Sequence, residues 1–180
     1  MMLKKHNLLY IHIPKCGGMS IERAFKHNVP RHMTIDRYVS SYDLKTVNDC
    51  YKFTFVRNPW DKYVSVWMYL KSTRNLPFED VVRNPPRKEN REEDYNHMTR
   101  PQLKVIQDAE GDLIVDEIFR FEDMPNAIKI ISERTGIPTS PMPKLRTTDH
   151  EHYRKYYTAE TKEIIAHRYE KEIEMFGYIF

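Results

Sequence analysis

A strand–loop–helix pattern that occurs twice in the first half of this 180-residue chain limits the possible folds more than any other feature of the sequence. The stretch Leu8–Ile13 is apolar and rich in β-formers, and it ends at a loop that contains the pair Gly17-Gly18. A second such stretch, Tyr51–Val56, is followed by Pro59, which suits the first turn of a helix. Strands that alternate with helices predict an α/β fold, here a P-loop-like three-layer α/β/α arrangement around a short central parallel sheet.

The rest of the chain continues this pattern. We expect a strand or strand pair within Leu113–Phe121 and a helix over Pro125–Thr135, which Gly136 would terminate. Thr158 is a suitable N-cap for a last helix. At this length we expect one domain over residues 1–180.

Composition limits the class of partner and the compartment. The net charge of +3 comes from basic residues interleaved with acidic ones, so we expect no nucleic-acid partner. Two cysteines, Cys16 and Cys50, do not make a disulfide framework and favour a reducing compartment. No signal peptide and no run as long as a membrane span is present, so we expect a cytoplasmic protein. No set of His, Cys and carboxylate residues has metal-site spacing, so we expect no metal.

The first loop, Pro14–Ser20, has the properties of an oxyanion site. A loop between a strand and a helix N-terminus presents backbone N–H groups and the positive end of the helix dipole. Lys15 adds a charge and Ser20 adds a hydroxyl donor. The Walker A pattern of nucleotide triphosphatases is absent. A tight turn with no ligand remains the alternative interpretation of the glycines.

The second loop places Arg57 at the carboxyl end of a strand, where open α/β sheets bind their ligands. A guanidinium is the best bidentate partner for a phosphate. Ser65, in the helix that follows, could reach the same anion. The alternative is that Arg57 is an ordinary surface charge and that Ser65 only fills a helix face.

Together the two loops resemble the PAPS-dependent sulfotransferase superfamily, most closely its carbohydrate branch, which heparan sulfate 2-O-sulfotransferase typifies. The resemblance rests on the segments Ile11–Ile21 and Phe53–Ser65, in this order. Phe119–Met124, Leu145–Thr148, Tyr153–Tyr157 and Phe176–Tyr178 extend it over nearly the whole chain. One departure is Cys16, where Thr is usual, so one hydroxyl donor is lost.

The resemblance implies the donor PAPS (3′-phosphoadenosine 5′-phosphosulfate), with PAP as the product, and assigns roles to both loops. Lys15 would bind the 5′-phosphosulfate and stabilise charge on the leaving oxygen. The backbone amides that would surround the phosphate are those of Cys16, Gly17, Gly18, Met19 and Ser20. Arg57 and Ser65 would hold the 3′-phosphate, while a later segment would close over the nucleotide through Arg146, Thr147 and Thr148.

A histidine is the expected general base for the acceptor hydroxyl, because its side chain titrates near neutral pH. The resemblance places the catalytic histidine between the two loops, where we choose His32. The alternative is that His32 is a surface histidine in a polar stretch. His97 is the rival, and His150 and His152 lie near the covering segment. His12 lies inside the first strand and is expected to be structural.

The sequence leaves the acceptor and two other functional classes open. The resemblance favours a hydroxyl on a glycan, with residues 76–107 as an insertion or lid on the acceptor side. The alternatives are a P-loop-like small-molecule kinase and a nucleotide-binding module without catalysis. No feature of the sequence indicates an oligomeric state.

Overall fold

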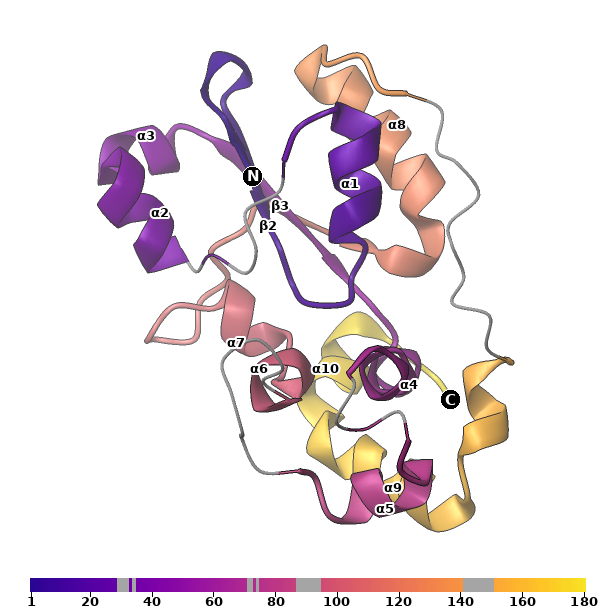
Figure 1. Ribbon diagram of the computed structural model, residues 1–180. Helices are drawn as coiled ribbons and strands as arrows, with labels where there is room; N and C mark the ends of the chain where they lie inside the picture. Colours follow the sequence, from indigo (N-terminus) through magenta and orange to yellow (C-terminus); the bar gives the residue numbers. More distant parts are fainter. Residues whose placement is uncertain (29–32, 34, 71–72, 74, 87–94, 141–150) are drawn as a thin grey trace. The chain divides into compact units, whose positions relative to one another are not determined.

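The structure is a computed structural model, which describes the chain except residues 29–32, 34, 71–72, 74, 87–94 and 141–150 (Figure 1). It divides into two compact units. The first comprises Met1–Val56 and Gln102–Leu145, and the second comprises Arg57–Pro101 and Arg146–Phe180.

The first unit is built on a four-stranded sheet with the order β1-β2-β3-β4. The strands are β1 (Met2–Leu3), β2 (Leu8–Ile11), β3 (Tyr51–Val56) and β4 (Glu117–Arg120). β2 and β3 are parallel, as are β3 and β4, whereas the short edge strand β1 runs antiparallel to β2. The predicted α/β class and the largely parallel sheet are therefore confirmed, while β1 was not predicted.

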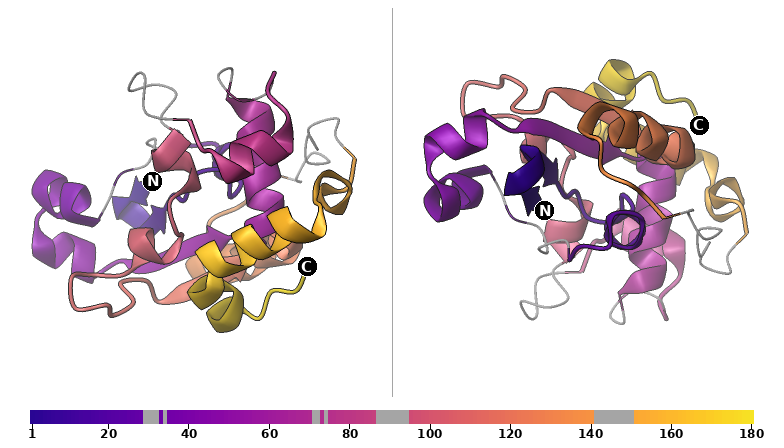
Figure 2. Two further views of the ribbon diagram at one scale, coloured as in Figure 1. Left: turned by 90° about the horizontal axis from the view of Figure 1, so that it is seen from below. Right: turned by 90° about the horizontal axis from the view of Figure 1, so that it is seen from above.

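The helices of this unit cover its sheet. They are α1 (Gly18–Phe25), α2 (Ile35–Tyr42), α3 (Leu44–Asn48), α7 (Leu103–Ile106) and α8 (Met124–Thr135), with the 3₁₀ turns η1 (Lys4–His6) and η2 (Phe121–Asp123). Figures 1 and 2 show α1 and α8 on one side of the strands and α2 and α3 on the other. Gly136 ends α8 in the left-handed conformation, as predicted.

Aromatic side chains from three strands form one face of the sheet. Tyr10 stacks on Phe53 with ring centroids 5.1 Å apart, and Phe55 lies 5.6 Å from Phe119. All four residues of β2 are buried, as expected of an inner strand in a parallel sheet. Each aromatic pair adds about 0.5–1.5 kcal/mol to the stability that burial alone provides. This packed row joins the three strands on one face of the sheet.

The second unit contains only helices among its described residues. They are α4 (Pro59–Tyr69), α5 (Phe78–Arg83), α6 (Tyr95–Thr99), the 3₁₀ turn η3 (Tyr153–Tyr156), α9 (Ala159–Arg168) and α10 (Glu170–Phe176). Thr158 caps α9, as predicted, and forms a reciprocal capping box with Thr161. The indole Nε1 of Trp60 donates a hydrogen bond to the carbonyl of Lys162 at 3.1 Å, which joins α4 to α9.

Several element boundaries differ from the predictions. The last helix divides into α9 and α10 because Tyr169 leaves helical geometry (φ −120°, ψ 24°), and its buried hydroxyl donates to the carbonyl of Thr99. Leu113 does not belong to β4 but forms an isolated antiparallel bridge with Gln107. The polar segment between α1 and β3 contains α2 and α3.

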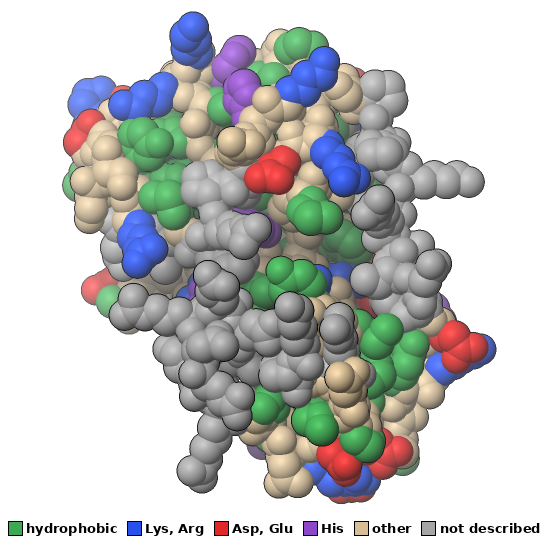
Figure 3. All heavy atoms as spheres, in the orientation of Figure 1, with side chains coloured by type: hydrophobic (Ala, Val, Ile, Leu, Met, Phe, Trp, Pro, Cys, Tyr) green, Lys and Arg blue, Asp and Glu red, His purple; other side chains and the backbone are tan. Residues whose placement is uncertain are grey.

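Across the described part of the chain, no helix has both the length and the apolar character needed to cross a membrane. Acidic and basic side chains occur together on the face that Figure 3 shows.

Candidate functional site

The loop after β2 has a backbone that only a few residue types adopt easily. Lys15 has φ +62° and Gly17 has φ +88°, so both lie in the left-handed region. This conformation is uncommon for a residue with a side chain, and such outliers concentrate at functional sites. Gly17 is the N-cap of α1, which therefore begins without a side-chain cap. By helix geometry, the amides of Gly18 and Met19 have no acceptor within α1 and are suited to an anion.

Two other amides of the loop already have backbone partners. The N–H of Cys16 donates to the carbonyl of Ile13 at 3.2 Å, and the N–H of Ser20 donates to the carbonyl of Gly17 at 2.9 Å. These bonds form the turn before α1 and the first turn of the helix itself. Of the amides predicted to surround the phosphate, those of Gly18 and Met19 are thus better placed to bind it than those of Cys16 and Ser20.

The positive φ of Gly17 favours glycine at that position, and a close contact with a ring restricts the side chain at Gly18. A Cβ added to Gly17 would overlap the methyl of Met124 and lie 3.2 Å from the ring of Phe121. A Cβ added to Gly18 would overlap the imidazole of His12. The loop therefore lies against His12, just after β2, and against η2 and the first residue of α8. A bare backbone held in this way, beside a lysine and a serine, fits a phosphate or sulfate group.

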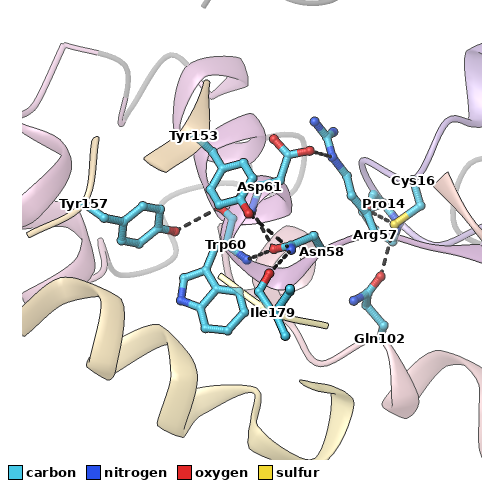
Figure 4. A network of polar contacts seen from close by, with 10 residues as sticks. All are labelled: Pro14, Cys16, Arg57, Asn58, Trp60, Asp61, Gln102, Tyr153, Tyr157 and Ile179. Atoms are coloured by element: carbon cyan, nitrogen blue, oxygen red, sulfur yellow. Dashed lines mark hydrogen bonds and ion pairs between the residues drawn. The ribbon is translucent and has the colours of Figure 1, made fainter. Parts of the chain in front are cut away.

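The thiol of Cys16 is turned into the protein. Cys16 is fully buried, and its Sγ donates to Oε1 of Gln102 at 3.3 Å and to the carbonyl of Pro14 at 3.5 Å (Figure 4). Nearby, burial raises the pKa of the Tyr10 hydroxyl well above its usual value, and the charge of a Cys16 thiolate would raise it further. Cys16 thus anchors the loop from inside, a role that the sequence did not indicate.

In the second unit, the start of α4 positions Arg57. Its Nε donates to Oδ2 of Asp61, one helical turn along, at 2.8 Å (Figure 4). Asn58 caps the helix, since its side-chain oxygen accepts from the amides of Trp60 and Asp61 at 3.1 and 3.4 Å. Pro59 occupies the first turn, as predicted. Only 8% of Arg57 is exposed, so it is not the ordinary surface charge of the alternative interpretation.

The C-terminal segment supports this helix start. Nδ2 of Asn58 donates to the carbonyl of Ile179 at 3.1 Å and reaches the hydroxyl of Tyr153 at 3.5 Å. The hydroxyl of Tyr157 donates to the carbonyl of Trp60 at 2.9 Å, and burial raises the pKa of Tyr157 well above its usual value. Sequence reasoning missed these contacts because they join positions about 100 residues apart that no local pattern connects.

The structure describes some of the other site residues that the sequence predicts. Ser65 lies on α4 and is buried, with 3% exposed. His97 is half-buried on α6, and His152 caps η3 by accepting from the amide of Arg154. His32, His150, Arg146, Thr147 and Thr148 lie outside the described residues. Among the residues that the structure does describe, no group of three or more His, Cys, Asp or Glu side chains could hold a metal.

The sheet determines where the two loops begin. Ile11, at the end of β2, pairs in parallel with Thr54 of β3, which continues to Val56. Both strands therefore end at the same edge of the sheet, the edge at which open α/β sheets bind ligands.

Comparison with known proteins identifies a family for this chain. A family model described as "Sulfotransferase family" matches residues 1–179. No curated protein and no solved structure matches the chain. Because the matched region includes both loops and nearly every residue, the chain belongs to the sulfotransferase family.

Proposed function

We propose that this protein transfers the sulfuryl group of PAPS to a hydroxyl group of a carbohydrate acceptor. Membership of the sulfotransferase family supports sulfuryl transfer in general. The observation that carries the donor assignment is the loop after β2, where left-handed Lys15 and the glycine backbone adjoin the N-terminus of α1. A P-loop-like three-layer fold is part of the proposal.

In this proposal, the first loop binds the 5′-phosphosulfate. The amides of Gly18 and Met19 donate to phosphate oxygens, with Ser20 and Lys15 beside them. During in-line transfer, the bond between sulfur and the bridging oxygen breaks while the acceptor oxygen bonds to sulfur. Negative charge then develops on the bridging oxygen, where the Lys15 ammonium stabilises it.

The second loop binds the 3′-phosphate in the same proposal. Arg57 supplies the guanidinium and Asp61 fixes its orientation. Ser65 adds a hydroxyl, and Arg146, Thr147 and Thr148 close over the nucleotide. Support comes from the parallel pairing of β2 and β3, which starts both loops at one edge of the sheet.

The acceptor proton requires a base. We assign this role to His32 and keep His97 as the rival, with residues 76–107 on the acceptor side. Activity that falls by about 100-fold in His32→Ala and persists in His97→Ala would support the assignment. The reverse result would transfer the role to His97.

Transfer of label from [³⁵S]PAPS to a panel of glycans tests the proposed function. We expect a labelled glycan with the wild-type protein and about 100-fold less product with Lys15→Ala. If PAP binds but no acceptor is labelled, the protein is a nucleotide-binding module. If ATP-Mg²⁺ supports transfer of phosphate instead, it is a kinase.

A further inference from the structure

The imidazole of His12 occupies the space beside Gly18 that any other residue would need for its side chain. Gly18 is buried and is the first residue of α1. An added Cβ would overlap Nε2 and Cε1 of the His12 ring and would lie 2.9 Å from its Cδ2. One edge of the ring therefore lies against the backbone of the first helical turn. A ring at position 12 and a methyl group at position 18 cannot coexist without displacement.

The ring is held in place by the aromatic face of the sheet. Its centroid lies 5.7 Å from that of Tyr10, with 32° between the planes. Tyr10 is fully buried, stacks on Phe53 and lies edge-on to Phe55 at 6.2 Å. Rotation of the imidazole would change its contact with Tyr10. This contact restrains the ring, so making room for a side chain at position 18 carries a cost.

The opposite side of the loop is also closed. Met124, the first residue of α8, and Phe121 of η2 lie close to Gly17, while the thiol of Cys16 donates to Gln102. His12 provides a further contact, at the turn whose amides face an anion in the proposed function. Binding groups act best when their supporting residues fix them before the ligand arrives.

We propose that His12 is a positioning residue that holds the first turn of α1 in the geometry that binds the 5′-phosphate of the donor. The proposal rests on the proposed function. From the sequence, His12 is expected to be structural. The proposal adds that His12 affects the affinity for the donor. His12 acts through Gly18 and need not touch the donor.

A double-mutant cycle tests this pair, with PAP affinity measured by calorimetry well below the melting temperature. Gly18→Ala should weaken PAP binding by about 30-fold or more, because the methyl group displaces the helix turn. His12→Ala should weaken it by about tenfold, because the turn loses its support. In the double variant the methyl group enters the vacated space. Its affinity should therefore be within about threefold of His12→Ala and better than that of Gly18→Ala.

His27→Ala, at an exposed position just after the far end of α1, is the matched control and should bind PAP like the wild type. If Gly18→Ala does not fold, recovery of folding in the double variant still tests the contact. Wild-type affinity in His12→Ala, even with a lower Tm, would overturn the positioning role while leaving the proposed function intact. If Gly18→Ala lowered the affinity for PAP by the same factor in the wild-type protein and in His12→Ala, the positioning role would also be overturned. A wild-type protein that does not bind PAP would instead contradict the proposed function, and this inference with it.

Discussion

The carboxylate of Asp61 accepts a hydrogen bond from Nε of Arg57 at 2.8 Å, one helical turn away on α4. The two side chains are only 10% and 19% exposed, so the pair is better shielded from water than a surface ion pair. In the proposed function, Asp61 engages Nε while the 3′-phosphate contacts the terminal nitrogens of the guanidinium, an arrangement that a lysine could not reproduce.

Arg57→Lys should weaken PAP binding by about tenfold or more, because the ammonium cannot contact Asp61 and hold a phosphate bidentately at once. Calorimetry with PAP and with AMP, which lacks the 3′-phosphate, measures this effect. AMP should bind the wild type and the variant equally. An equal loss for both nucleotides would place Arg57 away from the 3′-phosphate.

Lys15→Ala should lower kcat by about 100-fold or more, because charge on the leaving oxygen would lose its counter-charge. Lys26→Ala is the matched control, since Lys26 also has a positive φ (+54°) and lies at the other end of α1. Both variants exchange a lysine for alanine at a left-handed position, so a change in stability should be common to both. Steady-state kinetics measure the effect of the lost charge on kcat. Thermal melts measure the effect of the alanine at a left-handed position on stability. Similar kcat values for the two variants would contradict the role of Lys15.

Cys16→Val should lower the free energy of unfolding by about 1 to 2 kcal/mol, because the hydrogen bond to Gln102 is lost in a fully buried site. Cys16→Thr has the same shape as the valine variant but retains a donor, and should cost less. Urea unfolding measures both. Equal stabilities for the Thr and Val variants would show that the thiol contributes packing alone.

Glu160 gives the second unit a pH-dependent contribution to stability. Arg83 donates to both of its carboxylate oxygens, at 3.1 and 2.7 Å, and these hydrogen bonds are the main reason that its pKa lies below the usual 4.5. A carboxyl group whose folded pKa is lowered stabilises the protein above its unfolded pKa and loses this effect as the pH falls through the folded value. The stability difference between the wild type and Glu160→Gln should therefore shrink between neutral pH and about pH 3.

Urea unfolding across that pH range measures the difference. Glu163→Gln is the control on the same helix, because the partner of Glu163 is the adjacent Lys162 at 4.0 Å. The effect of Glu163→Gln on the free energy of unfolding should be smaller than that of Glu160→Gln at every pH. A wild-type advantage over Glu160→Gln that stays constant down to low pH would contradict the assigned ion pair.

The local features of the fold were predictable from the sequence. The strand Tyr51–Val56 has the predicted bounds, because a run of β-formers ends at the Asn58-Pro59 helix start. Gly136 and Thr158 end and begin helices as predicted, since caps depend on residues close in the chain.

Long-range contacts could not be predicted in this way. No local pattern relates Asn58 to Ile179 or Cys16 to Gln102, and both contacts arise from tertiary packing. His12 illustrates the difference within the site. The sequence predicted His12 inside the first strand, whereas β2 ends at Ile11, and only the structure shows the ring of His12 against Gly18.

The change in Tm on addition of PAP, compared with ATP-Mg²⁺, tests the donor assignment most directly. A ligand at 100 times its Kd that binds only the folded protein adds about 2.7 kcal/mol, which corresponds to a rise of about 5 to 10 °C for a chain of this size. We predict such a rise with PAP and little change with ATP-Mg²⁺. A rise with ATP-Mg²⁺ and none with PAP would contradict the assignment of PAPS as the donor.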